Sequence, residues 1–108
     1  TGMDMPTINI IPTSDKLLPP NGVYVTRVEL PDIKLPGVTN LGIKPTIDED
    51  EKRLSIETHI LDYSGDLYGE RVLIEFLKYL RPERRFEGLS ELSDQIKRDI
   101  RETRRFAQ

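Results

Sequence analysis

The sequence of 108 residues contains no cysteine, which excludes disulfides, zinc–thiolate sites, iron–sulfur clusters and cysteine nucleophiles. It contains a single histidine, His59, so a site built from several imidazole ligands is excluded as well. A hard cation such as Mg²⁺, which prefers oxygen ligands, remains compatible with the side chains present. The lack of cysteine is also typical of the cytoplasm, which is the location that we expect.

Long hydrophobic runs and basic clusters are missing too. No apolar run approaches the length of a membrane-spanning helix, and no leader-like segment opens the chain, so we expect a soluble protein with no membrane partner. Acidic residues (19) outnumber basic ones (16), and no basic run alternates with aromatic side chains. This pattern argues against a nucleic-acid partner. The length suits one domain, residues 1–108, with one core.

Short strand patterns, separated by turn signals, fill most of the chain. No helix-length segment lies between any two of them, so parallel crossover units are excluded and an antiparallel barrel is favoured. A break in the apolar alternation near Thr26 predicts a β-bulge. We expect a long connection over 31–36 and a solvated acidic loop over 45–52. The expected strands are residues 7–11, 22–30, 37–43, 54–61 and 71–80.

One helix is predicted at the C-terminal end of the chain. It begins after Gly88, with Glu91 in its first turn, and runs to about Arg105. Apolar residues recur at spacings of three and four along it, which is typical of a helix that packs on a core. We assign this stripe no chemical role. Its members are Leu89, Leu92, Ile96 and Ile100.

Glu57 lies in the middle of the predicted strand 54–61, on the face opposite Ile56 and Ile60. A carboxylate in such a run is either a solvent-facing residue or an acid placed to accept a proton. Thr7 and Asn9 share one face of the first strand. They are neutral oxygen donors that suit Mg²⁺ and phosphates, or simply residues at a ladder end. A glycine-rich Walker loop is absent from the sequence.

Several short motifs occur in order along almost the whole chain. They are Pro6-Thr7-Ile8-Asn9, Gly22-Val23-Tyr24, Asn40-Leu41-Gly42 with Pro45-Thr46, Ile56-Glu57-Thr58-His59-Ile60, Leu67-Tyr68-Gly69-Glu70 and Leu80-Arg81-Pro82-Glu83, with Gln95-Ile96 and Asp99-Ile100 on the helix. Together they resemble the riboflavin kinase family, including the C-terminal kinase module of bacterial bifunctional FAD synthetases. The resemblance implies a six-stranded Greek-key β-barrel with a C-terminal α-helix. It also implies transfer of the γ-phosphoryl group of ATP to the ribityl 5′-hydroxyl of riboflavin, which gives FMN.

The resemblance also implies roles for individual residues. Thr7 and Asn9 match the pair that binds Mg²⁺ and the nucleotide phosphates, and Glu57 matches the general base. The loop that contains Arg81 and Phe86 matches a mobile flap over the flavin, and residues 37–46 resemble a second flap on the nucleotide side. Arg81 contacts the flavin or phosphate or is solvated, and Phe86 covers the flavin ring or pins the loop. His59 either orients Glu57, or is solvated or paired across the strands.

The chain departs from the family pattern near its start. The glycine-rich segment before Pro-Thr-x-Asn is reduced to Gly2, and Asp4 stands where a glycine is common. We therefore expect further residues of the barrel upstream of Thr1, and an adenylyltransferase domain in the same full-length chain. The alternative function is a non-catalytic flavin- or nucleotide-binding barrel.

Overall fold

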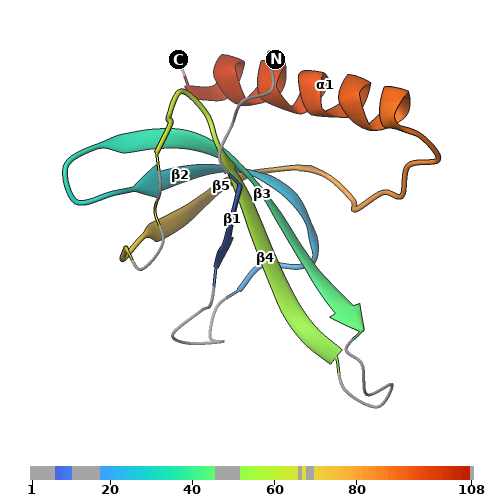
Figure 1. Ribbon diagram of the computed structural model, residues 1–108, viewed down its shortest axis with the longest axis horizontal. Helices are drawn as coiled ribbons and strands as arrows, with labels where there is room; N and C mark the ends of the chain where they lie inside the picture. The colour runs from blue at the N-terminus through green and yellow to red at the C-terminus, as the bar shows by residue number, and fades with distance from the viewer. Residues whose placement is uncertain (1–6, 11–17, 46–51, 66, 68–69, 108) are drawn as a thin grey trace.

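The computed structural model describes residues 7–10, 18–45, 52–65, 67 and 70–107, and it contains five strands and one helix (Figure 1). The predicted acidic loop lies mostly outside these residues. Within them, no helix has both the length and the apolar character that crossing a membrane requires. The elements are β1 (Thr7–Ile10), β2 (Gly22–Glu29), β3 (Lys34–Pro45), β4 (Lys52–Ile60), β5 (Leu73–Arg81) and α1 (Leu89–Ala107).

All five strands belong to one antiparallel sheet with the order β1-β4-β3-β2-β5. The expectation of a mainly β, antiparallel fold with one C-terminal helix is therefore confirmed. The sheet is not closed, since β1 and β5 stand at the two ends of this order and do not pair within the described part of the chain. Closure into a six-stranded Greek-key barrel stays a prediction.

The pairing of β2 explains the broken apolar alternation in its sequence. Its register with β5 shifts between Val23 and Tyr24 and again between Val25 and Thr26. At an irregularity of this kind two neighbouring residues of one strand oppose a single residue of its partner, which breaks the regular alternation of side chains and increases the local twist. The bulge predicted near Thr26 is confirmed.

The prediction of a long connection over residues 31–36 is wrong, because β3 already begins at Lys34. A tight turn between Leu30 and Ile33, closed by an N–H···O bond of 2.8 Å, leads directly into β3. Pro36 is accommodated inside β3 because it lies at the end of the ladder with β4. Its carbonyl accepts a hydrogen bond from the Leu61 N–H at 2.9 Å, and proline lacks only the N–H that a return bond would need. The strand expected over 37–43 is confirmed as part of β3, which pairs with β2 over residues 34–41 and with β4 over residues 37–45. The second flap that the resemblance implies for residues 37–46 stays a prediction.

One face of the sheet carries the larger part of the core. Two apolar clusters lie on it, and a chain of buried threonine hydroxyls runs across three strands of the sheet. Thr26 and Thr39 are hydrogen-bonded at 2.9 Å, and Thr39 and Thr58 at 2.8 Å. The hydroxyls satisfy one another, which removes most of the cost of burying them. The buried apolar members are Val28, Leu30, Leu35 and Ile60 in one cluster and Tyr24, Leu41 and Ile56 in the other.

Helix α1 lies along the other face of the sheet (Figure 1). Its contact is a third cluster, in which Ile100 packs against Val23, Val38 and Leu61. The helix begins at Leu89 as predicted, but Leu89 itself is 84% exposed and takes no part in the packing. Leu89 therefore does not belong to the part of the predicted stripe that faces the sheet.

A salt bridge near the C-terminal end fixes the helix to the turn after β4. Arg104 donates to both carboxylate oxygens of Asp62, at 2.8 and 2.9 Å. Asp62 has a φ of 60°, in the left-handed region that aspartate tolerates better than most residues. The ion pair therefore links the C-terminal end of α1 to the turn after β4.

Candidate active site between the helix and the sheet

A cavity of about 320 Å³ lies between α1 and the face of the sheet that the helix covers. This volume is at the lower end of the range of roughly 300–1,000 Å³ that small-molecule sites occupy. Half of its lining residues are apolar and half are polar or charged, and they come from the strands, from the loop before α1 and from α1 itself. The lining residues are Val23, Val38, Asn40, Glu57, His59, Arg81, Arg84, Phe86, Leu92, Ile96, Asp99 and Ile100.

Glu57 lies on the sheet side of the cavity, at the centre of a three-strand register. Its Cα pairs with that of Asn40 on β3 and with that of Asn9 on β1. The residue is half-buried. The antiparallel ladder thus brings residues 9, 40 and 57, which are far apart in the chain, to one level of the sheet.

His59, the next residue of β4 on the same face, pairs with Thr7 of β1. His59 Nδ1 and Thr7 Oγ1 are hydrogen-bonded at 2.8 Å. Burial lowers the pKa of His59 below its ordinary value, although the charges of Glu57 and Asp99 act in the opposite direction. The cross-strand pairing that the sequence left open for His59 is confirmed.

Arg81, at the end of β5, forms a forked ion pair with Asp99 of α1. Its Nε donates to Oδ1 at 3.0 Å and its Nη2 donates to Oδ2 at 2.8 Å. Gln95, one helical turn before Asp99, also donates to Oδ1 at 3.0 Å. A planar guanidinium and a carboxylate in this geometry form a strong and directional contact. The pair therefore fixes the end of β5 to the helix.

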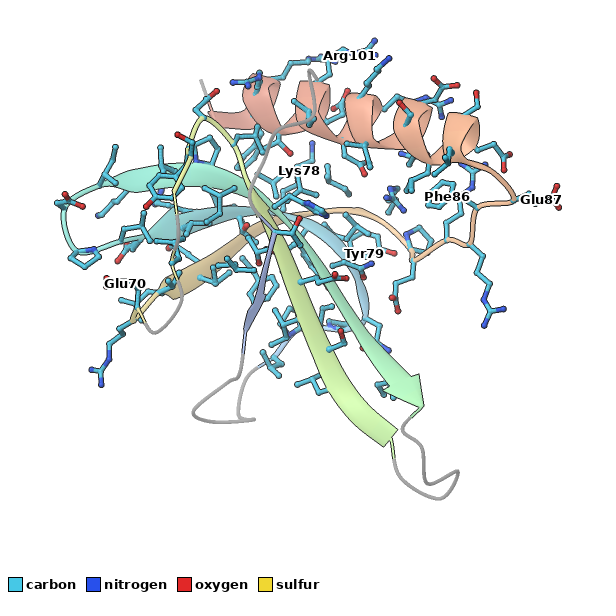
Figure 2. The ribbon with its side chains drawn as sticks, viewed as in Figure 1. Glu70, Lys78, Tyr79, Phe86, Glu87 and Arg101 are labelled. Carbon is cyan, nitrogen blue, oxygen red and sulfur yellow. The ribbon has the colours of Figure 1, made fainter. Side chains whose placement is uncertain are left out.

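The loop between β5 and α1 is held against the helix by Arg84. Its Nη1 donates to Gln95 Oε1 at 3.1 Å, and its guanidinium lies 5.0 Å from the centre of the Phe86 ring. Figure 2 shows Phe86 beneath α1, while Glu87 points away at the turn that enters the helix. The Glu87 N–H donates to Glu91 at 3.1 Å, which caps the first turn. The loop thus forms one wall of the cavity.

The structure brings together four of the residues weighed for the site in the sequence, since the cavity is lined by Glu57, His59, Arg81 and Phe86. Thr7 lies beside it through its bond to His59. Asn9 is in register with Glu57, but its side chain is outside the described part of the chain.

Sequence reasoning gave the helix no part in the site, yet Leu92, Ile96, Asp99 and Ile100 form one wall. A signal was present in the sequence. Gln95, Asp99 and Thr103 are polar residues at spacings of four, which places them in one row on the helix surface. All three are buried. A buried polar row on an otherwise amphipathic helix indicates a partner network.

Comparisons with known proteins give one consistent family. Residues 1–107 match the family model Flavokinase, described as riboflavin kinase. The chain is 37% identical over 102 residues to the bifunctional riboflavin kinase/FMN adenylyltransferase of Bacillus subtilis (strain 168), and 40% identical over 102 residues to that of Escherichia coli (strain K12). Each alignment covers 94% of this chain and 32% of the relative, so the chain spans about a third of the length of these relatives.

A solved structure is similar in fold. It is titled as the crystal structure of a macrolide-efflux protein from Streptococcus pneumoniae. The TM-score is 0.85 and the sequence identity 31%, over 95% of this chain and 33% of that one. The arrangement of strands and helix described above is therefore shared with a protein about three times as long.

Proposed function

The chain belongs to the riboflavin kinase family, and on that premise we propose that it transfers the γ-phosphoryl group of ATP to the 5′-hydroxyl of the ribityl chain of riboflavin. The observation that carries the proposal is the cavity between α1 and the sheet, which combines apolar surface with polar groups that include the carboxylate of Glu57. Riboflavin consists of an aromatic ring system, which apolar surface binds, and a polyhydroxy chain, which polar groups bind.

We assign the flavin ring to the helix side of the cavity. Leu92, Ile96 and Ile100 supply apolar surface, and Phe86 lies on the loop that forms the adjoining wall. Flat aromatic ligands gain most of their affinity from such surface, while a few polar groups fix their orientation. Arg81 is a suitable orienting group because Asp99 holds its guanidinium in place.

Glu57 is the proposed general base. Phosphoryl transfer asks a protein for positioning, for neutralisation of charge and for a proton acceptor. A carboxylate on a central strand is rigidly placed, and from the cavity wall it can accept the proton of the attacking hydroxyl. Proton transfer of this kind is typically worth about 10²–10⁴-fold in rate.

Thr7 and Asn9 are the proposed ligands for Mg²⁺ and the nucleotide phosphates. Within the described residues no cluster of three or more His, Asp or Glu side chains could hold a metal by itself. Neutral oxygen donors nevertheless fit Mg²⁺, which keeps several waters and binds largely through substrate phosphates. Bound Mg²⁺ would offset the negative charge of the phosphates. The structure supports the placement through β1, which runs beside the strand that carries Glu57.

Incubation with riboflavin, MgATP and excess Mg²⁺, followed by separation of flavins, tests the activity. FMN should form in proportion to enzyme. Thr7→Ala should raise the KM for MgATP more than the KM for riboflavin, because one oxygen ligand of the metal is lost. Riboflavin binding without any FMN would instead support the non-catalytic binding barrel.

We further propose that the chain is the kinase module of a longer protein, as in the relatives, which are named bifunctional with an FMN adenylyltransferase. In that protein an additional strand would close the open sheet into the six-stranded barrel. Comparison of the urea midpoints of residues 1–108 and the longer chain tests this point. The longer chain should unfold at higher urea, since closure removes an exposed strand edge.

A further inference from the structure

Asn40 carries a polar atom with no partner. Its Oδ1 is buried, and it is the one buried side-chain nitrogen or oxygen in the described part of the chain that has no hydrogen bond. Almost all buried polar atoms in folded proteins are paired, so an unpaired acceptor requires a reason. Asn40 lies on the central strand β3 and lines the cavity. Its position therefore suggests that the partner is a ligand.

The other polar groups of the cavity wall support this reading. Arg81 and Asp99 bond to each other, Arg84 bonds to Gln95, and His59 bonds to Thr7. Each of these groups already has at least one hydrogen-bond partner within the protein. The side-chain oxygen of Asn40, in contrast, has no partner. Asn40 is directly opposite Glu57 in the ladder between β3 and β4. Opposed residues in an antiparallel pair have Cβ atoms about 4.5–5.5 Å apart, so one hydroxylated chain can reach both.

We propose that Asn40 binds the ribityl chain of riboflavin, its amide oxygen accepting a hydrogen bond from a ribityl hydroxyl while the terminal hydroxyl lies at Glu57. The inference rests on the proposed function. Rotation about the Cβ–Cγ bond of asparagine follows a broad two-fold profile, so the oxygen can turn toward the cavity when a donor arrives. Asn40 would then select flavins that carry a polyhydroxy chain, whereas the apolar wall binds the ring.

The test compares riboflavin with lumiflavin, which has the same ring but no ribityl chain, in fluorescence titrations of the whole chain. Asn40→Ala should raise the Kd for riboflavin about tenfold, the usual value of a lost hydrogen bond. Its Kd for lumiflavin should stay within twofold of wild type. Asn40→Val, which keeps a strand-favouring side chain, should give the same pattern if the alanine variant folds poorly. Asn21→Ala, at an exposed asparagine outside the cavity, is the matched control.

Urea unfolding of the free proteins gives a second readout. Removal of an unpaired buried oxygen should leave the midpoint unchanged or raise it, whereas removal of a structural hydrogen bond would lower it. Equal riboflavin affinity in wild type and both variants would overturn the inference and leave the proposed function intact. Equal losses for riboflavin and lumiflavin would also overturn it, since the amide would then act on the ring. Failure of the wild type to bind riboflavin would overturn the proposed function itself.

Discussion

Two arginine–aspartate pairs in this protein have nearly the same geometry but very different surroundings. Arg81 and Asp99 meet at 2.8 and 3.0 Å, and Arg104 and Asp62 at 2.8 and 2.9 Å. The side chains of the first pair are 21% and 8% exposed, and those of the second 51% and 54%. The same substitution in each pair, Asp99→Asn and Asp62→Asn, therefore compares a buried pair with an exposed one.

The expected losses differ severalfold. Removing one partner of a buried pair typically costs about 3–5 kcal/mol because the other charge is left buried. Arg81 keeps some access to water, so we expect Asp99→Asn to lower the free energy of unfolding by about 2–3 kcal/mol. An exposed pair is worth about 0–1 kcal/mol. Asparagine also tolerates the left-handed backbone of Asp62, so Asp62→Asn should cost less than about 1 kcal/mol.

Urea unfolding at pH 7, in low salt and in 0.5 M salt, measures both quantities. Salt should reduce the small effect at Asp62 and leave most of the effect at Asp99, because buried charges are screened less. A double variant, Arg81→Met with Asp99→Leu, should recover stability, since apolar groups of similar size replace a buried pair well. Similar losses for the two single variants would refute the reasoning from burial.

Two further predictions concern stability. The hydrogen bond from Arg104, opposed by burial and aided by the charge of Arg104, holds the pKa of Asp62 below its ordinary value. The pair therefore stabilises the fold fully above the unfolded pKa of about 3.9 and loses this contribution as the pH falls through the lower folded pKa. Urea midpoints measured from pH 5 to pH 2 should fall more steeply in wild type than in Asp62→Asn, and equal slopes would contradict the assignment. Gly37→Ala should cost about 1–3 kcal/mol, because the added Cβ would lie 2.9 Å from both Thr26 Oγ1 and Val28 Cγ2. An unchanged thermal midpoint would show that these neighbours move aside at no cost.

Local patterns in the sequence predicted the elements that depend on alternation and periodicity. The strand around Glu57, the bulge near Thr26 and the start of α1 all follow from side-chain spacing. The early start of β3 could not be read in this way. Pro31 and Pro36 indicate a loop, and only the level at which β4 ends allows Pro36 to sit in a strand.

The site depends more on long-range pairing. The sequence alone shows that Glu57 is a carboxylate within a β-branched run. Its neighbours in space depend on the sheet order, which places β4 between β1 and β3. Asp99 and Arg81 are 18 residues apart and on different elements, so no periodicity connects them. The ordered family motifs predicted the family, because residues that long-range packing brings together occur in it at fixed places along the chain.

The central claim is that Glu57 takes the proton of a hydroxyl bound in the cavity beneath α1. Glu57→Gln tests it most directly, because the amide keeps the size of the side chain and cannot act as a base. With saturating MgATP, the kcat for FMN formation should fall by about 10²–10⁴-fold, while the Kd for riboflavin and the urea midpoint stay close to those of the wild type. A kcat within threefold of wild type, with riboflavin still bound, would contradict the claim.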